Sequence, residues 1–244
     1  MYLASPFCYI DLRSWHRTFG ASFLTLADTW TAEIVEKRSR FIATAIPVRT
    51  EADALAALAG VRAEHPDARH HVYAYRIGVR VLHERFSDDG EPSGTAGRPV
   101  LEVIRRKELT NVLVVVTRYF GGILLGASGL VRAYTEATAA VLSEAPKLVC
   151  AQMCDILVTC AYEHYGKLIH LLEKAGLRVY DTEFADVVRF RLVVLETEVP
   201  NTVALLSDAT SGQAKCEASP PAYVGVTDDG KLVRDVWPAE DAPG

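Results

Sequence analysis

Residues 87–134 have the sequence SDDGEPSGTAGRPVLEVIRRKELTNVLVVVTRYFGGILLGASGLVRAY, in which two glycine-rich segments flank one apolar run. Glycine is favoured where the backbone must take a positive φ or where another group approaches it closely. Arg118, Tyr119 and Arg132 lie beside such glycines and could hold an anion or a flat ring. We therefore predict a binding groove between the two segments.

The apolar run between these segments predicts a strand. Asn111 to Val116 is continuously apolar after its first residue, so the strand should be central in a sheet or covered on both faces. Before it, Arg98-Pro99 opens a short helix, with Pro99 in the first turn, where its missing donor is tolerated. After it, a helix should run from about Ala127 to Ala145.

The flanking sequence extends this pattern into a mixed domain. Thr50 should cap a helix, with Asp53 at the position that completes the cap, and the helix should end near Pro66. Its expected apolar stripe is Leu55, Leu58, Ala59 and Val61. The expected strands are Trp30–Arg38, Arg40–Val48, His71–Ile77 and Val79–Phe86.

A second unit follows from Leu148. The expected elements are a strand 150–160, a helix 163–175, strands 177–182 and 186–195, a helix 201–209 and a strand 213–218. This β-α-β-β-α-β order is the ferredoxin-like arrangement. The sequence thus predicts an α+β protein of two domains, residues 29–147 and 148–220. We expect residues 221–244 to be a loose tail and residues 1–28 to be an extension.

The extension has no sustained helical or strand period. It is either disordered or the product of a start codon set too early in the gene model. It also lacks the pattern of a secretory signal, since Trp15, His16 and Arg17 interrupt its apolar residues.

Composition favours a cytoplasmic location. The chain has 244 residues, 50% of them hydrophobic, which is enough for one large or two small cores. No apolar run reaches the roughly 18 residues that suggest a membrane span, so we expect no membrane partner. The five cysteines are most simply reduced thiols.

Charge is divided unevenly between the two domains. Residues 29–147 hold 16 Lys and Arg against 14 Asp and Glu, a net charge of +2, and residues 148–244 hold 8 against 15, a net charge of −7. This distribution permits a local basic face on the first domain. It argues against binding long duplexes through bulk charge.

The first glycine-rich segment has two interpretations. Asp88, Asp89 and Glu91 could ligate Mg²⁺ or Ca²⁺, or they could cap backbone donors in a tight turn. The spacing lacks the ligand count of a calcium loop, so we expect the turn and no metal. The backbone amides around Ser93, Gly94, Thr95 and Gly97 could form a nest for an anion.

The second glycine-rich segment is the better candidate for binding. Gly121, Gly122, Gly126 and Gly129 surround the start of the long helix, whose exposed amides favour an anion. Tyr119 and Phe120 could stack on a base. For Phe120 we favour a core position that fixes the turn, and we expect Tyr134 to pack inward. For Arg118, ligand binding and an internal ion pair with Asp88, Asp89 or Glu91 both stay open.

Patterns typical of several other sites are missing. The glycines are not followed by the Lys and Ser/Thr of a P-loop, and the histidines form no zinc pattern. Ser128 lies in Gly-Ala-Ser-Gly, where a hydroxyl that caps the helix is the simplest role. We expect no cofactor and no catalytic residue.

The two segments resemble the signature of the YigZ/IMPACT family. The similar motifs are Asp88-Asp89-Gly90-Glu91-Pro92-Ser93-Gly94-Thr95-Ala96-Gly97-Arg98-Pro99 and Thr117-Arg118-Tyr119-Phe120-Gly121-Gly122, continuing through Leu125 to Tyr134. Upstream, Glu36 to Ile42, Ala68-Arg69-His70 and Tyr73-Ala74-Tyr75 are also similar to family motifs. Ser128 departs from the family, which more often has glycine there.

The resemblance implies a first domain like the second domain of a small-subunit ribosomal protein and like domain IV of elongation factor G. It implies a second domain like domain V of the same factor. Eukaryotic members regulate translation by competing for an activator of a starvation-responsive kinase. RNA, the ribosome or a translation-regulator protein are therefore the implied partners.

We expect a non-catalytic, translation-associated regulatory protein that binds through the first-domain groove. Arg98, Arg118 and Arg132 would supply charge to that groove and Tyr119 a stacking surface. The alternative is an enzyme acting on a phosphorylated or anionic small molecule, with Asp88, Asp89 or Glu91 as its base.

Overall fold

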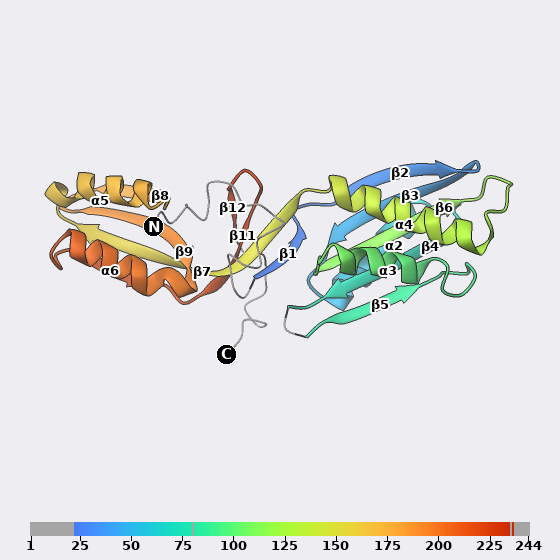
Figure 1. The fold of residues 1–244 in the computed structure, drawn as a ribbon, viewed down its shortest axis with the longest axis horizontal. Helices are drawn as coiled ribbons and strands as arrows, with labels where there is room; N and C mark the ends of the chain where they lie inside the picture. The colour runs from blue at the N-terminus through green and yellow to red at the C-terminus, as the bar shows by residue number, and fades with distance from the viewer. Residues whose placement is uncertain (1–21, 80, 235, 237–244) are drawn as a thin grey trace. The chain divides into compact units, whose positions relative to one another are not determined.

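The computed structural model describes residues 22–79, 81–234 and 236 (Figure 1). The chain divides into two compact units. Phe23–Leu148 is called the first domain below, and the segment from Val149 onward the second domain. Both units mix helices and strands, as the sequence predicts.

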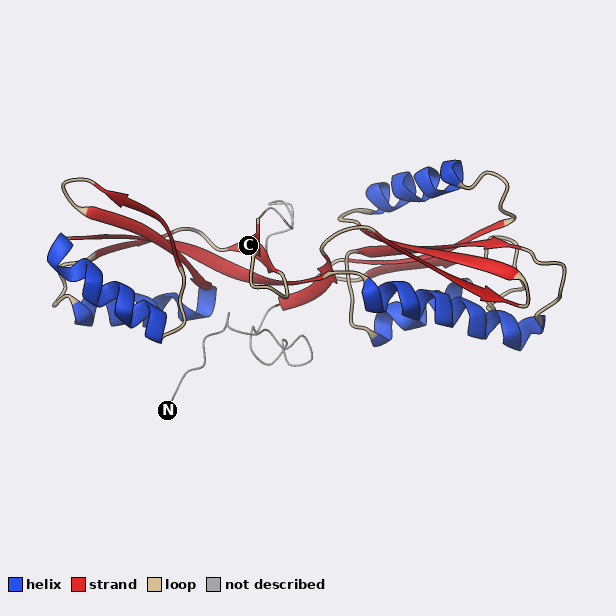
Figure 2. Cartoon of the chain, turned by 90° about the horizontal axis from the view of Figure 1, so that it is seen from above, coloured by secondary structure: helices blue, strands red, loops and turns tan. Residues whose placement is uncertain are grey.

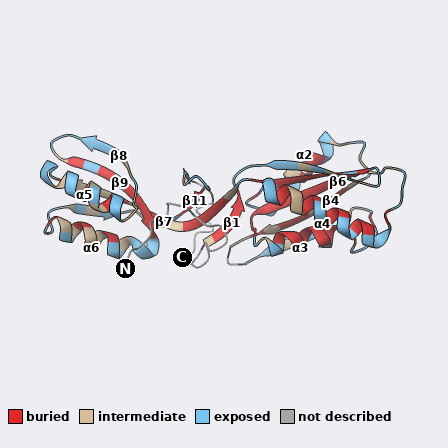
Figure 3. Ribbon diagram, turned by 45° about the horizontal axis from the view of Figure 1, so that its top comes forward, coloured by how far each residue is buried: buried red, intermediate tan, exposed pale blue. Residues whose placement is uncertain are grey.

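The first domain is built on one antiparallel sheet with the strand order β2-β3-β6-β4-β5. Its strands are β2 (Trp30–Glu36), β3 (Ser39–Pro47), β4 (His70–Ile77), β5 (His83–Ser87) and β6 (Val112–Tyr119). The apolar run of β6 is central and buried as far as Arg118, which confirms the prediction (Figure 3).

Helices cover both faces of this sheet (Figure 2). They are α2 (Glu51–Glu64), α3 (Gly97–Arg106) and α4 (Gly126–Glu144). Helix α2 packs against β4 and β6, in a core that includes Leu113 and Val115. Helices α3 and α4 contact each other and cover the other face. Because side chains alternate along a strand, the odd-numbered residues of β6 face α2 and the even-numbered ones face α3 and α4.

The start of α2 follows the sequence prediction. The Thr50 hydroxyl accepts from the Asp53 amide at 3.1 Å, and the Asp53 carboxylate accepts from the Thr50 amide at 3.0 Å. This is a capping box. The buried stripe consists of Ala54, Leu58 and Val61, whereas the predicted Leu55 and Ala59 are exposed. The prediction was wrong at these two positions, because the stripe follows the i, i+4, i+7 spacing from Ala54.

Gly60 lies inside α2 on its exposed side, and a Cβ there would meet nothing within 4 Å. The replacement Gly60→Ala restricts the unfolded chain and fits the helix without a clash. We expect it to raise the free energy of unfolding by about 0.5–1 kcal/mol, measured by urea denaturation. An unchanged or lower midpoint would show that this glycine has a role that its surroundings do not reveal.

The second domain contains the predicted β-α-β-β-α-β order. Its elements are β7 (Lys147–Cys160, which begins just before the boundary), α5 (Tyr162–Lys174), β8 (Val179–Phe184), β9 (Val188–Leu195), the short η1 (Glu196–Glu198), α6 (Val199–Ala209) and β10 (Lys215–Ala218). Strand β7 pairs with β9 on one side and β10 on the other, and β8 pairs with β9. The core includes Phe190 and Leu168.

Three strands lie where the sequence analysis predicted no strand. Strand β1 (Ser22–Leu26) falls within the expected extension, and its Leu24 carbonyl accepts from the Thr110 amide at 2.9 Å. Strand β11 (Ala222–Val226) falls within the expected tail and pairs with β7, followed by β12 (Leu232–Val233). Both β1 and β11 are short and mostly buried, so neither shows the alternation that marks a half-exposed strand. Residues 1–21 of the expected extension lie outside the described residues.

Four cysteines are among the described residues, and all four are free thiols. Burial raises the pKa of Cys150 to about 12. Burial also raises the pKa of Cys154, Cys160 and Cys216. These thiols are therefore poor nucleophiles at neutral pH. None of the described helices is long and apolar enough to cross a membrane.

Candidate functional site

The two glycine-rich segments lie at one end of the first-domain sheet (Figure 1). The first follows β5, and the second joins the end of β6 to α4. The β2–β3 turn lies at the same end, because Arg40 pairs with Tyr119 across the sheet. The start of β4 also lies there, because His70 pairs with Arg118.

The first glycine-rich segment folds around the carboxylate of Asp88. Asp88 accepts hydrogen bonds from the backbone amides of Gly94, Ala96 and Gly97 at 2.8–3.1 Å. The amide nest proposed for an anion is therefore filled by Asp88. Within the same loop, the Thr95 hydroxyl donates to the Pro92 carbonyl and Ser93 is exposed. The described residues contain no cluster of three potential metal ligands.

Asp89 and Glu91 also have partners within the domain. Asp89 accepts from Arg62 at 2.9 Å and from the His71 amide at 2.7 Å. Glu91 accepts from Arg118 at 2.5 Å and from the Tyr134 hydroxyl at 2.8 Å. Burial and the Glu91 carboxylate raise the pKa of Tyr134 above its ordinary value, so its hydroxyl remains a donor.

The ion pair between Arg118 and Glu91 is buried, with side-chain exposures of 7% and 4%. Of the two roles left open for Arg118, internal pairing is therefore present. Arg118 Nε is buried and has no hydrogen-bond acceptor among the described residues.

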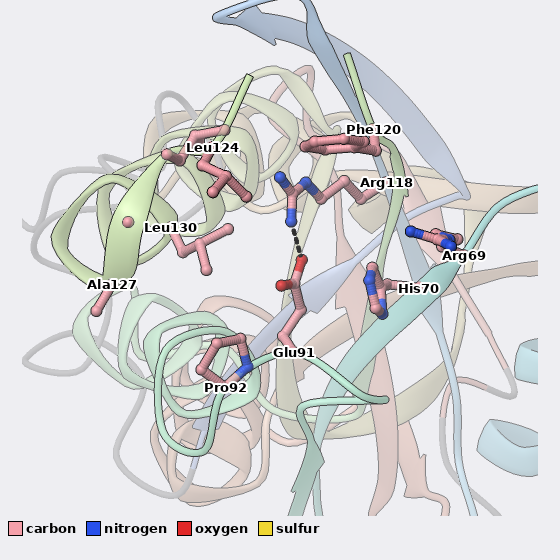
Figure 4. A pocket seen from close by; sticks show the side chains of 11 residues that line it. Arg69, His70, Glu91, Pro92, Arg118, Phe120, Leu124, Ala127 and Leu130 are labelled. Atoms are coloured by element: carbon pink, nitrogen blue, oxygen red, sulfur yellow. Dashed lines mark hydrogen bonds and ion pairs between the residues drawn. The ribbon is translucent and has the colours of Figure 1, made fainter. Parts of the chain in front are cut away.

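The two residues of this pair line a pocket of about 430 Å³. Arg118 lies between Phe120 and Glu91 in its floor (Figure 4). Arg69 and His70 line one part of its wall, and Leu124, Leu130 and Pro92 line another. Gly126 and Ala127 bring the first turn of α4 to its edge, where no side chain caps the helix.

Phe120 corrects one sequence prediction. It was expected in the core, but it is 44% exposed and lines the pocket, with the Arg118 guanidinium 5.7 Å from its ring centroid. The strand ends at Tyr119, so Phe120 begins the loop and is not held against a helix. An exposed aromatic ring next to a cation can stack on a base, which is the alternative role that the sequence offered for Phe120 beside Tyr119.

Tyr119 lies on the opposite face of the sheet from Arg118. Its hydroxyl is 3.0 Å from His65 Nδ1 at the end of α2, and Arg40 lies 5.5 Å from its ring centroid. Neighbouring residues on a strand point to opposite faces, so Arg118 and Tyr119 do not line one pocket. Tyr134 is fully buried and packs against Phe41 at 5.2 Å between ring centroids, as expected.

The structure also separates the other predicted arginines from the pocket. Arg98 lines a different, smaller groove between α3 and α4, of about 220 Å³, together with Arg106 and Val131. Arg132 is exposed on α4 and lines neither depression. Arg118 is the one predicted cation that the pocket includes.

The glycines at this end of the sheet meet different structural requirements. Gly122 and Gly126 have φ of 83° and 74°, in the left-handed region that favours glycine. Gly121 instead packs on the β2–β3 turn, where a Cβ would lie 2.1 Å from the Arg38 carbonyl carbon. Gly97 and Gly129 are buried in helices. Ser128 is exposed within the first turn of α4 and makes no cap, because the helix begins earlier, at Gly126.

Three exposed cations at this end were missed as site residues. Lys37 and Arg38 form the two-residue β2–β3 turn, and Arg69 precedes β4. None of the three makes a side-chain hydrogen bond or ion pair with another described residue. We call Lys37, Arg38, Arg69, Phe120 and the first turn of α4 the basic end.

The turn that holds Lys37 and Arg38 is unusual. Their φ angles are 45° and 64°, a combination for which turns of this kind prefer Asn-Gly. Two side chains with a Cβ are strained in that conformation.

The family model described as "Impact N-terminal domain" matches residues 37–142. A second family model, described as "Domain of unknown function (DUF1949)", matches residues 158–213. The IMPACT family member YvyE of Bacillus subtilis is 34% identical over 83% of this chain and 94% of its own length. The chain belongs to the IMPACT family. The family member YigZ of Escherichia coli is 34% identical over 72% of this chain and 87% of its own.

A solved structure is similar as well. The "Crystal structure of an hypothetical protein" aligns with a TM-score of 0.54 at 32% identity, over 80% of this chain and 96% of that one. The match to the IMPACT N-terminal domain spans every residue of the basic end and both glycine-rich segments. The candidate site therefore lies within the part of the chain that defines the family match.

Proposed function

We propose that this IMPACT-family chain is a translation-associated regulatory protein that binds single-stranded RNA at the basic end of its first domain. One observation carries the proposal. Exposed cations that have no acidic partner among the described residues lie with an exposed phenylalanine at one end of a sheet. Phosphates pair with such cations, and bases stack on such rings.

The charge at this end supports RNA over a neutral partner. The three carboxylates of the first glycine-rich segment are already engaged, Asp88 by backbone amides, Asp89 by Arg62 and Glu91 by Arg118. The cations of Lys37, Arg38 and Arg69 are thus left for a ligand. A single strand suits the site better than a duplex, because a duplex does not present its bases to a stacking ring.

The same contacts weigh against the enzymatic alternative. Each carboxylate named as a candidate base is engaged in a hydrogen bond or ion pair, and Glu91 is almost fully buried. A general base must reach the proton that it removes. We therefore favour binding without catalysis, in the cytoplasm, where translation takes place.

The proposal includes the finer fold assignment. The second-domain strands pair in the order β10-β7-β9-β8, all antiparallel, and α5 and α6 pack on one core. This order supports a ferredoxin-like domain. For the first domain, we propose the fold shared by the second domain of a small-subunit ribosomal protein and domain IV of elongation factor G.

The test is a titration of a single-stranded RNA with the full chain at several salt concentrations, followed by fluorescence anisotropy. The double variant Lys37→Asn/Arg38→Gly removes two cations and supplies the residues that the turn prefers. We expect the log–log salt slope to fall by about 1.4 for two lost phosphate contacts. If the variant and the unaltered chain bind equally at 1 M salt, their affinities should differ roughly 25-fold at 0.1 M salt. A slope difference of about 1.4 over this tenfold change in salt concentration gives that factor.

The control is Arg98→Ala/Arg106→Ala, which removes two exposed cations from the groove between α3 and α4. It should change the RNA affinity far less. If the control variant weakens binding and the turn variant does not, the site lies between α3 and α4. If the unaltered chain does not bind RNA or ribosomal subunits, a translation-regulator protein becomes the candidate partner.

A further inference from the structure

We propose that the groove between α3 and α4 docks an acidic amphipathic helix of a partner protein. The groove, of about 220 Å³, is lined by Arg98, Pro99, Val103 and Arg106 of α3 and by Val131 and Thr135 of α4. We call it the arginine groove. It shares no residue with the basic end, so the proposal goes beyond RNA binding there and does not depend on it.

The apolar part of the groove comes from the packing of the two helices. Helices α3 and α4 contact each other on one face of the first-domain sheet (Figure 2). Among the lining residues, Pro99 and Val103 are buried, whereas Val131 is 38% exposed. The apolar surface that a partner would remove from water is therefore mainly that of Val131.

The charged lining residues leave two cations without partners. Arg98 and Arg106 are both exposed, and neither makes a side-chain hydrogen bond or ion pair with another described residue. The carboxylate in the lining belongs to Glu102, which accepts from Arg105 at 2.9 Å. Positive charge in the groove is therefore left for an acidic ligand.

The spacing of these two arginines matches a helical partner. They are eight residues apart on α3, so they lie about 12 Å apart along its axis at a rise of about 1.5 Å per residue. Carboxylates two turns apart on a partner helix have nearly the same spacing. A guanidinium and a carboxylate form charge-assisted hydrogen bonds. The expected ligand thus has acidic residues two turns apart beside an apolar stripe that meets Val131.

A helix suits this surface better than an extended segment does. An extended peptide gains affinity from backbone hydrogen bonds to an exposed sheet edge. The arginine groove lies between two helices, in which the interior backbone groups bond within each helix. A helical partner satisfies its own backbone in the same way, so it needs only side-chain contacts.

The composition of the groove also favours a protein over RNA. Sites for single-stranded RNA combine cations with aromatic rings on which bases stack. The residues that line the arginine groove include no aromatic side chain, and its exposed apolar residue is the aliphatic Val131.

The experiment measures binding of the full chain to a fluorescent synthetic peptide of about five helical turns. One side of the peptide helix carries a stripe of leucines, and glutamates two turns apart flank the stripe. One control peptide has glutamine in place of every glutamate. Another has the same composition in an order that forms no stripe. By fluorescence anisotropy, we expect the acidic striped peptide to bind about 10-fold more tightly than either control.

Three variants of the chain test the named contacts. Arg98→Ala/Arg106→Ala should weaken binding of the acidic striped peptide about 5-fold, since two exposed ion pairs are lost. Val131→Glu should weaken it at least about 10-fold, because it removes the apolar contact and adds a like charge. Arg98→Glu/Arg106→Glu should instead prefer a striped peptide with lysine in place of every glutamate, a gain that a misfolded chain would not show.

Two control variants match these changes outside the groove. Leu55→Glu replaces an apolar side chain that is 46% exposed on α2. Lys37→Asn/Arg38→Gly removes two exposed cations from the basic end. Both should leave the affinity for the acidic striped peptide unchanged.

Several results would overturn the inference. These are no binding of the acidic striped peptide, equal affinities for it and its two controls, or no loss with Val131→Glu. Peptide binding that is lost in Lys37→Asn/Arg38→Gly and kept in Arg98→Ala/Arg106→Ala would move the peptide to the basic end. If sedimentation shows a dimer that Val131→Glu dissociates, a second copy of the chain covers the groove and the inference fails.

Discussion

Glu91→Gln is expected to lower the free energy of unfolding by about 3–5 kcal/mol. The substitution keeps the size of the side chain and removes the charge that balances Arg118. Arg118 is 6% exposed and has no other carboxylate within ion-pair distance among the described residues. An uncompensated buried charge is the reason for the large effect. Tyr134 would also lose the ionised acceptor of its hydroxyl.

Two further variants make this prediction specific. Glu91→Leu/Arg118→Met replaces the pair by apolar side chains and should recover most of the lost stability, because no buried charge remains. Glu33→Gln removes one partner of the exposed ion pair between Glu33 and Arg40 and should leave the stability nearly unchanged. Urea unfolding of all four proteins provides the comparison. If Glu91→Gln resembles Glu33→Gln, the Arg118–Glu91 pair is not buried in solution.

Gly121→Ala is expected to lower the free energy of unfolding by about 3 kcal/mol or more, at the upper end for overpacking. An added Cβ would lie 2.1 Å from the Arg38 carbonyl carbon and 2.4 Å from the Ser39 amide nitrogen. Both atoms belong to the backbone of the β2–β3 hairpin, which cannot rotate aside as a side chain can. The turn and the loop after β6 would have to move apart.

The neighbouring Gly122 supplies the matched control. Its φ is 83°, but a Cβ there would meet nothing within 4 Å. Gly122→Ala should therefore cost only the left-handed conformation, about 1–2 kcal/mol. The measurement is again urea unfolding. An effect of Gly121→Ala no larger than that of Gly122→Ala would mean that the two loops do not touch as described.

Local signals in the sequence predicted most of the fold. The Thr50 capping box, Pro99 in the first turn of a helix and the apolar run of β6 all have the predicted roles. These features depend on residues close together in the chain. Strands β1 and β11 were missed because they are short and pair with distant segments, so only the assembled fold shows their place.

The candidate site was predicted only in part. Glu91 was correctly offered as a partner of Arg118, but Tyr119 was assigned to the same groove. The period of two along β6 already places Tyr119 on the other face, so this error could have been avoided. Arg69 could not have been placed, since only the pairing of His70 with Arg118 brings the start of β4 to the pocket.

Lys37 and Arg38 were predicted to lie in a strand that ends at Arg38, and this prediction was wrong. Strand β2 ends at Glu36, and the two residues form the turn with positive φ. Their position next to Gly121 depends on the pairing of β3 with β6. The sequence alone therefore showed neither this turn nor the surface to which it belongs.

The central claim is that RNA binds at the basic end of the first domain. Amide hydrogen exchange of the full chain, with and without a saturating single-stranded RNA, tests it most directly. We predict slower exchange on binding in residues 37–39, 69–71 and 119–129, with residues 149–233 unchanged. Slower exchange confined to residues 149–233, or no change at a concentration where the titration shows saturation, would contradict the claim.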